Sequence, residues 1–284
     1  MCADTMRVWQ VDRASRTSSY GRPSWYSQAE NVPGSRGNDK RLADAPLQLV
    51  RHDWAQLSWR YPVAFMSYRR IEPVLQTEYA QCGFVATAMA ASTVGRRPNI
   101  QDMFNWAYRQ GFTNVGDIFN ISHLKALCDR YVRVPSTVMM FPSKEALIAD
   151  LIRGKLFLVP YDAGYENGAP SLYNGHKAHW AVVLGALLMR PYCPPCISRL
   201  PRLAGNKPIY LSNNNVYLSH MYDGMDFVFA QHGWYAEPDL WSIETLRESC
   251  WQLNEVDPRN AASYVLPRGG IRQGLRGKVL RLDL

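Results

Sequence analysis

The chain has 284 residues, of which 47% are apolar and 12% are aromatic. This length suits two domains or one large domain with a tail, and the apolar content supports a real core, which excludes wholesale disorder. The net charge of +8 favours an acidic partner such as nucleic acid, anionic lipid or an acidic polypeptide, without choosing among them.

The beginning of the chain differs in composition from the rest. Arg, Ser, Gly, Asn and Pro dominate residues 11–46, and aliphatic residues are scarce there. Because such a stretch has too few apolar side chains to form a core, we predict that residues 1–46 form a disordered or loosely attached arm. We expect residues 47–284 to form one domain.

Helical patterns come first within this domain, and strand patterns follow. Helices are predicted over residues 84–94, 100–109, 115–131 and 143–153, with Ser143 as the N-cap of the last one. Strands are predicted over 156–161, 179–188, 227–230, 264–266 and 278–282, with one more helix over 242–250. Helices followed by strands indicate an α+β fold, in which a helical half packs on an antiparallel sheet.

Membrane insertion and export are not expected. The longest apolar run, residues 180–189, is much shorter than the roughly 18 residues that a spanning helix needs. No secretory signal is visible near the N-terminus, so we predict a cytoplasmic protein with reduced thiols. The six cysteines are Cys2, Cys82, Cys128, Cys193, Cys196 and Cys250.

Cys82 has the sequence surroundings of a catalytic nucleophile. It precedes Gly83 at the start of a predicted helix, and Gln76 lies six residues before it. The positive end of the helix dipole favours a thiolate, and the unpaired N–H of Cys82 can donate to an oxyanion. The side-chain N–H₂ of Gln76 can supply a second donor to the same oxyanion.

A thiol nucleophile needs a base, and His179 is the first candidate. It begins an apolar strand, which can aim the imidazole at a helix N-terminus in the other half of the fold. His176 precedes the strand and is the alternative base. The group that orients the imidazole is open: Gln231 is one candidate, and Asp223, Asp226 and Asn213 to Asn215 are its rivals.

The motifs around these residues resemble the papain-like cysteine peptidases. The pattern Gln-x5-Cys-Gly followed by His-Trp-Ala-Val-Val-Leu is spaced as in the bacteriocin-processing peptidases. Three blocks, in the same order, resemble the actin maturation protease family of animals more closely. They are Ala80-Gln81-Cys82-Gly83, Gly175-His176-Lys177-Ala178-His179-Trp180-Ala181-Val182, and Tyr264-Val265-Leu266-Pro267-Arg268-Gly269-Gly270-Ile271 with Gly274-Leu275-Arg276-Gly277.

This resemblance implies a papain-like fold and a cytosolic aminopeptidase. Such an enzyme removes the acetylated N-terminal Met or Cys from immature actin, with Cys82 as nucleophile, His179 as base and Gln76 as oxyanion donor. It implies no metal or organic cofactor. The acidic N-terminus of actin would be the partner of the basic C-terminal segment, in which six Lys/Arg residues face only Asp283.

Two features of the chain fall outside this resemblance. Family members can carry a proline-rich N-terminal segment suited to profilin, whereas the arm here has only Pro23, Pro33 and Pro46, so profilin is not an expected partner. Cys193 and Cys196 form one CxxC pair without a second pair, so we interpret them as free thiols in a Pro-rich loop rather than as a zinc or redox site.

Other functions remain open at the level of sequence. A papain-like peptidase or a deubiquitinase-like hydrolase with another substrate, and a catalytically inactive protein-binding module, are the alternatives. Nucleic-acid binding is suggested only by the net charge, and no nucleic-acid motif is visible, so we expect no such partner. The Gly-rich loop 164–175 precedes His179 and either covers the substrate cleft or is an ordinary connection.

Overall fold

The computed structural model describes residues 60–78, 80–165, 167–192, 200, 202, 209–211 and 224–284. The predicted arm 1–46, its boundary with the domain and the Cys193/Cys196 pair lie outside the described residues and stay predictions. Within the described part of the chain, no helix combines the length and apolar character needed to cross a membrane.

Five helices of nine or more residues are present in the described residues. They are α2 (Cys82–Ser92), α3 (Ile100–Arg109), α4 (Ile121–Tyr131), α5 (Lys144–Ile152) and α6 (Ile243–Trp251). Four of them begin at side chains that accept a hydrogen bond from an otherwise unpaired N–H of the first turn: Asn99, Asn120, Ser143 and Ser242. Shorter elements are η4 (Ala261–Ser263) and α7 (Gly270–Gly274).

The strands form one sheet that is antiparallel except at one edge. They are β1 (Val63–Tyr68), β2 (Ser136–Met140), β3 (Leu156–Ala163), β4 (Pro170–Ser171), β5 (Ala178–Arg190), β6 (Ile209–Leu211), β7 (Met225–Gln231), β8 (Asp239–Ser242) and β9 (Lys278–Leu282). The order is β2-β9-β3-β5-β1-β6, and β7 pairs with β5 and β8. Among the described strands, only β1 and β6 pair in parallel. The long strand β5 is therefore the centre, since it pairs with β1, β3 and β7.

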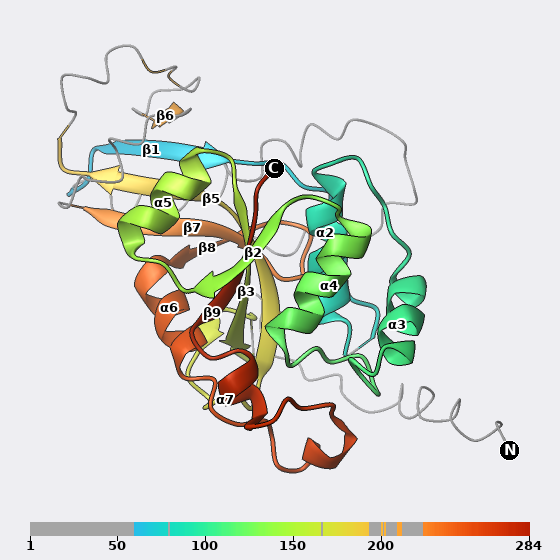
Figure 1. The fold of residues 1–284 in the computed structure, drawn as a ribbon. Coiled ribbons are helices and arrows are strands. Elements are labelled where there is room, and N and C mark those ends of the chain that lie inside the picture. Colours follow the sequence, from blue (N-terminus) through green and yellow to red (C-terminus); the bar gives the residue numbers. More distant parts are fainter. Residues whose placement is uncertain are drawn as a thin grey trace, which may run out of the picture. The chain divides into compact units, whose positions relative to one another are not determined.

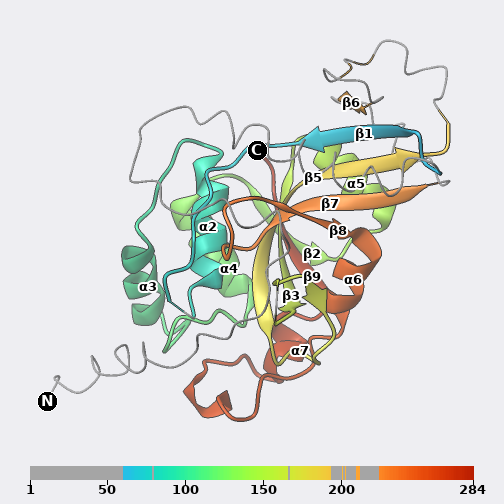
Figure 2. The ribbon, with the colours of Figure 1, turned by 180° about the vertical axis from the view of Figure 1, so that it is seen from behind.

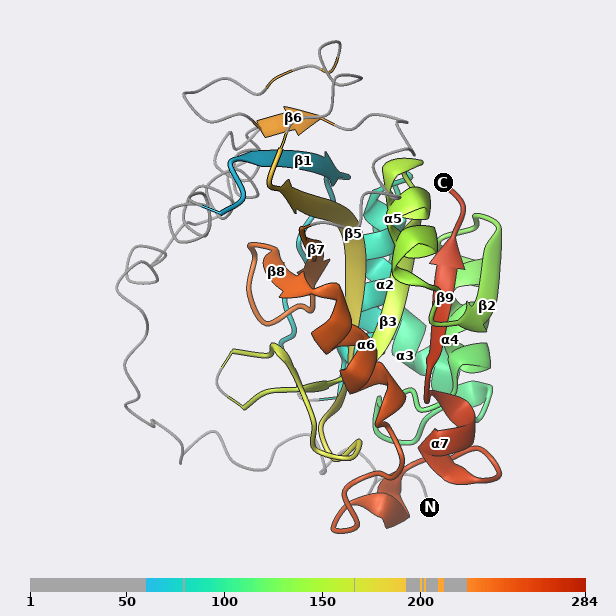
Figure 3. The same ribbon diagram turned by 90° about the vertical axis from the view of Figure 1, so that its left-hand side faces the viewer.

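Helices cover both faces of this sheet (Figures 1 and 2). On β3, Leu156 and Leu158 face a core with α2, α3 and α4, whereas Phe157 and Val159 face a second core with α5 and α6. This alternation follows from the two-residue period of a strand, and it makes every β3 side chain buried. Figure 3 shows α6 in front of β5 and β3 in a side view. The predicted α+β class, with helices packed on an antiparallel sheet, is confirmed.

Two predicted elements were wrong in part or whole. Residues 115–120 are not helical: Gly116 has φ +119°, outside the right-handed helical region, and the helix begins only after the N-cap Asn120. Residues 264–266 form no strand, and Tyr264 instead packs on Phe119, with ring centroids 4.7 Å apart. Strands β1, β2, β4, β6 and β8 had no counterpart in the prediction.

Candidate active site

Cys82 is the first residue of α2, as predicted. The first hydrogen bond of the helix runs from Val85 N–H to Gln81 C=O, so the N–H groups of Cys82 and Gly83 have no acceptor within the helix. The thiol is buried and lies close to the backbone N–H groups of Trp180, Gly83 and Cys82 itself. Because Trp180 follows His179, this contact places the sulfur against the start of β5.

The tight turn before α4 contacts both the segment that carries Cys82 and the strand that carries His179. A Cβ on Gly116 would overlap the carbonyl oxygen of Ala80, and the carbonyl of Ile118 accepts a 3.0 Å hydrogen bond from Trp180 Nε1. A Cβ on Gly83 would lie only 3.1 Å from the Ile118 side chain. This turn therefore determines how closely α2 approaches β5. The sequence did not predict this role, because residues 115–120 were expected to be helical.

His179 is held by a main-chain group rather than by a side chain. It lies near the start of β5, opposite Tyr161 of β3, and its Nε2 is 2.9 Å from the carbonyl oxygen of His232. Because a carbonyl can only accept, Nε2 carries the hydrogen and Nδ1 is the basic nitrogen. The ring of Trp234 also packs on the imidazole, with centroids 5.1 Å apart.

Of the candidates that the sequence offered as orienting groups, the two that the structure describes, Gln231 and Asp226, bond elsewhere. Gln231 directly precedes His232, but its side-chain amide donates to the carbonyl of Ala236 at 2.6 Å and not to His179. Asp226 pairs with Arg190 at 2.7 Å, near the other end of β7. Asp223 and Asn213 to Asn215 lie outside the described residues. Sequence patterns cannot predict a main-chain orienting group, because the position of the His232 carbonyl depends on the path of the chain after β7.

Gln76 lies beside the same turn. Its N–H donates to the carbonyl of Gly233 at 2.8 Å, and a Cβ on Gly233, which has φ +82°, would lie 3.5 Å from the Cγ atom of Gln76. Gln81 steadies the segment between Gln76 and Cys82, since its Oε1 accepts from the N–H groups of Thr77 and Glu78 at 3.2 and 3.3 Å. The turn after β7 therefore contacts both Gln76 and His179, whereas Cys82 lies against Trp180. Gln76 is not among the residues that line the pocket beside Cys82 and His179.

A pocket of about 270 Å³ opens above these residues. Its lining includes Cys82 and His179, together with Asp117, which sequence reasoning did not select. Apolar walls come from Phe119, Tyr264, Val256 and Trp234, and parts of the loop 164–175 form one side. Gly164, Tyr165 and Gly175 of that loop line the pocket, whereas a role in covering a bound substrate stays a prediction.

Burial keeps both candidate reacting groups neutral in the free protein. It raises the pKa of Cys82 to about 12, and the Asp117 carboxylate adds to this rise. It also lowers the pKa of His179 to about 3, with help from His232. The sequence-based expectation of a helix-stabilised thiolate is therefore wrong for the free state, because desolvation outweighs the nearby N–H groups. Burial likewise raises the pKa of Asp117 to about 6.

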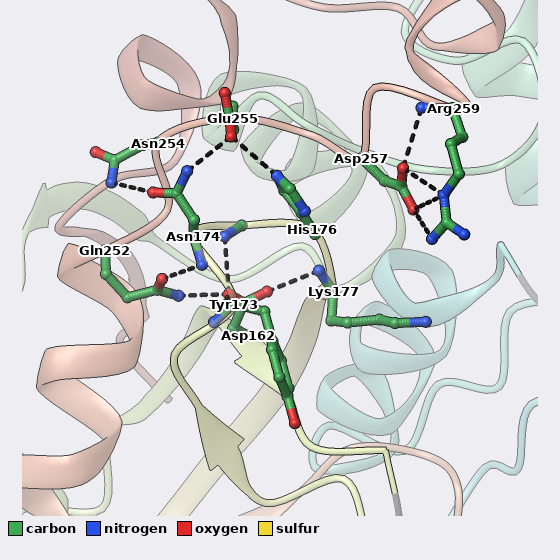
Figure 4. A network of polar contacts seen from close by, with 11 residues as sticks. Asp162, Tyr173, Asn174, His176, Lys177, Gln252, Asn254, Glu255, Asp257 and Arg259 are labelled. Atoms are coloured by element: carbon green, nitrogen blue, oxygen red, sulfur yellow. Dashed lines mark hydrogen bonds and ion pairs between the residues drawn. The ribbon is translucent and has the colours of Figure 1, made fainter.

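A buried carboxylate organises the rim of the pocket (Figure 4). Asp162, the neighbour of Tyr161 on β3, accepts hydrogen bonds of 2.7 to 2.8 Å from the N–H groups of Tyr173, Gly175 and Lys177. It also accepts one of 2.5 Å from the side chain of Gln252. The carboxylate thereby fixes the segment that leads into His179.

Further pairs brace this rim. His176 Nε2 lies 3.0 Å from Glu255, which also accepts from Asn174, so the alternative base is engaged in a surface contact. Asp257 forms a two-pronged pair with Arg259. Among the described residues, no group of three or more His, Cys, Asp or Glu side chains is arranged to hold a metal ion.

Several known proteins are similar to this chain. Residues 71–187 match the sequence model of the family described as actin maturation protease-like, C-terminal domain. The actin maturation protease of Danio rerio is 33% identical over 79% of this chain and 76% of its own length. That of Bos taurus is 30% identical over 90% of this chain and 74% of its own length. A C39-like peptidase from Bacillus anthracis is similar over 76% of this chain and 98% of its own, with 11% identity and a TM-score of 0.42.

Proposed function

This chain belongs to the actin maturation protease family, and from that premise we propose that it is a cytoplasmic, papain-like cysteine aminopeptidase. Its substrate is immature actin, from which it removes the acetylated N-terminal Met or Cys. The observation that carries the proposal is the meeting of Cys82 at a helix N-terminus with His179 on β5 in one pocket.

The reaction begins from a neutral thiol and a neutral imidazole. His179 Nδ1 takes the proton of Cys82 as the sulfur bonds to the carbonyl carbon of the first residue. The resulting oxyanion accepts hydrogen bonds from the N–H of Cys82 and the side chain of Gln76. His179 then gives its proton to the leaving amine as the C–N bond breaks. Water hydrolyses the thioester, with His179 taking its proton, which releases the acetylated amino acid and restores the thiol.

A neutral resting pair suits this sequence of steps. Transfer of the thiol proton is costly in the buried pocket until a developing oxyanion and its donors share the charge. The free enzyme is thereby protected from side reactions of a permanent thiolate. The main-chain carbonyl of His232 stabilises the transient imidazolium, because it accepts from Nε2 throughout.

Mass spectrometry of synthetic peptides tests the proposal. Peptides beginning acetyl-Met and acetyl-Cys, followed by an acidic actin-like segment, are incubated with the purified protein. We expect loss of one acetylated residue with the native chain, and a loss of rate of at least about a thousandfold with Cys82→Ala or His179→Ala. Cys128→Ala is the matched control, because this thiol is equally buried but does not line the pocket.

The alternatives predict different outcomes of the same experiment. No cleavage by the native chain, with Cys82 still labelled by an electrophilic acyl probe, would indicate a peptidase or deubiquitinase-like hydrolase with another substrate. No cleavage and no labelling would indicate an inactive binding module. Cleavage that survives Cys82→Ala would contradict the proposed nucleophile.

A further inference from the structure

The charged side chains that line the pocket differ in how they are compensated. His176 is paired with Glu255, and Asp257 is paired with Arg259. Asp117 and Lys177 remain, and neither forms an ion pair with any of the described residues. Within the described part of the chain, the pocket therefore holds one carboxyl group and one ammonium group without an oppositely charged partner.

Lys177 is fixed at its backbone and extends its side chain away from the supporting network. Its N–H donates to Asp162 at 2.8 Å, and its carbonyl accepts from Ala163 N–H at 3.0 Å. Figure 4 shows the side chain pointing away from the Asp162 carboxylate. The Nζ atom lies 4.3 Å from the centre of the Tyr165 ring, which holds the ammonium beside the pocket.

Asp117 is related to Cys82, and Lys177 is related to His179. Asp117 acts on the Cys82 thiol, whereas Lys177 precedes His179 by two residues. His179 protonates the leaving amine in the proposed mechanism, so the second residue of the substrate lies next to His179, in the pocket that Lys177 also lines. A carboxylate near the thiol disfavours an acidic first residue, and an ammonium near His179 favours an acidic second one.

We propose that Lys177 is a specificity-determining residue, whose ammonium binds the side-chain carboxylate of the second residue of the substrate. This inference rests on the proposed aminopeptidase function. Tyr165 presents the ammonium in a half-buried position, where a charge-assisted hydrogen bond gains strength over one in open water. The selectivity is thus built into the pocket and does not depend on long-range attraction by the basic C-terminal segment.

Two peptides that differ in one residue test this inference. They begin acetyl-Met-Asp and acetyl-Met-Asn and are neutral at all later positions, which removes long-range attraction. We expect the native enzyme to prefer the Asp peptide by about tenfold or more in kcat/KM at physiological salt. Lys177→Met should reduce this ratio to near one, and Lys177→Arg should retain most of it.

A charge reversal gives the sharper result. Lys177→Glu should favour a peptide beginning acetyl-Met-Lys over the one beginning acetyl-Met-Asp. Lys125→Met is the matched control, because this lysine lies on α4, outside the pocket lining, and should keep the native preference. A melting temperature near that of the native protein confirms that each variant is folded.

The outcomes separate this inference from the function it rests on. Equal cleavage of the Asp and Asn peptides by the native enzyme, or an unchanged preference in Lys177→Met, would overturn the role of Lys177 and leave the aminopeptidase in place. Cleavage of no peptide by the native enzyme would overturn the aminopeptidase and this inference together.

Discussion

The two sides of the pocket differ in whether their titratable groups are charged. Around Cys82 and His179, burial suppresses ionisation: the pKa of the thiol rises to about 12 and that of the imidazole falls to about 3. At the rim, the Asp162 carboxylate accepts four hydrogen bonds, and Glu255 and Asp257 are each paired. One side is kept neutral, and the other is built on satisfied carboxylates.

This difference teaches how the site separates reactivity from rigidity. The rim needs permanent charge, because charge-assisted hydrogen bonds hold a loop with few apolar contacts in one conformation. The reacting groups need the opposite, because charge on them is useful only as the substrate reacts. Variants that alter either side should therefore have effects of different kinds.

The largest effect is expected from removal of the central rim carboxylate. Asp162 is fully buried, and Asp162→Ala leaves the three N–H groups without this acceptor and removes one of the two acceptors of the Gln252 amide. We expect the free energy of unfolding to fall by about 3 to 5 kcal/mol, measured by urea denaturation. The exposed Asp129→Ala should change it by at most about 1 kcal/mol. A similar small loss in Asp162→Ala would show that the rim does not depend on this carboxylate.

A smaller effect is expected where α2 approaches the turn at Ile118. The Cβ of Gly83→Ala would lie 3.1 Å from the Ile118 side chain, which must therefore shift slightly, and 3.5 Å from Trp180, which is an ordinary contact. We expect a cost of about 1 to 3 kcal/mol and a clear loss of kcat, because Cys82 moves relative to His179. Unchanged peptide cleavage by this variant would mean that Ile118 can move aside without displacing Cys82.

The neutral side can be made more reactive. Asp117 contributes to the raised pKa of Cys82, so Asp117→Asn should lower that pKa and increase the thiolate fraction at a given pH. We expect alkylation by iodoacetamide at pH 8 to become several-fold faster, with rates that rise further with pH. Cys128, which is buried and outside the pocket lining, should stay unlabelled in both proteins. An unchanged rate would show that desolvation alone controls the thiol.

The smallest effect concerns the pair of exposed Arg259 and buried Asp257 at the rim. Arg259 lowers the pKa of Asp257 from 3.8 to about 2. A depressed carboxyl pKa stabilises the fold above the pKa of the unfolded chain, and this contribution is lost as the pH falls towards 2. Melting temperatures of Arg259→Gln should therefore lie slightly below native ones near neutral pH and converge with them in acid. A constant gap at every pH would assign the effect to packing.

The sequence predicted the elements with strong local signals and missed those determined by distant contacts. The helix over α3 and the strand β9 were predicted with the observed bounds, because periodicity and capping residues are local. The placement of Cys82 and His179 in one pocket agrees with their motifs. Asp117 was missed because it lies in a turn whose apolar spacing imitates a helix. The role of Asp162 depends on Gln252, which is 90 residues away.

The hydrogen bond from His179 to the main chain of His232 has a consequence for genetic analysis of this enzyme. A side-chain partner can be deleted by a single codon change, but a peptide carbonyl is present whatever residue occupies position 232. A scan for a third member of the catalytic set should therefore find no dominant hit. Sensitivity should instead be spread over positions that determine the path of the backbone there, such as Gly233, with φ +82°, and Asp239, which binds the His232 ring at 2.9 Å.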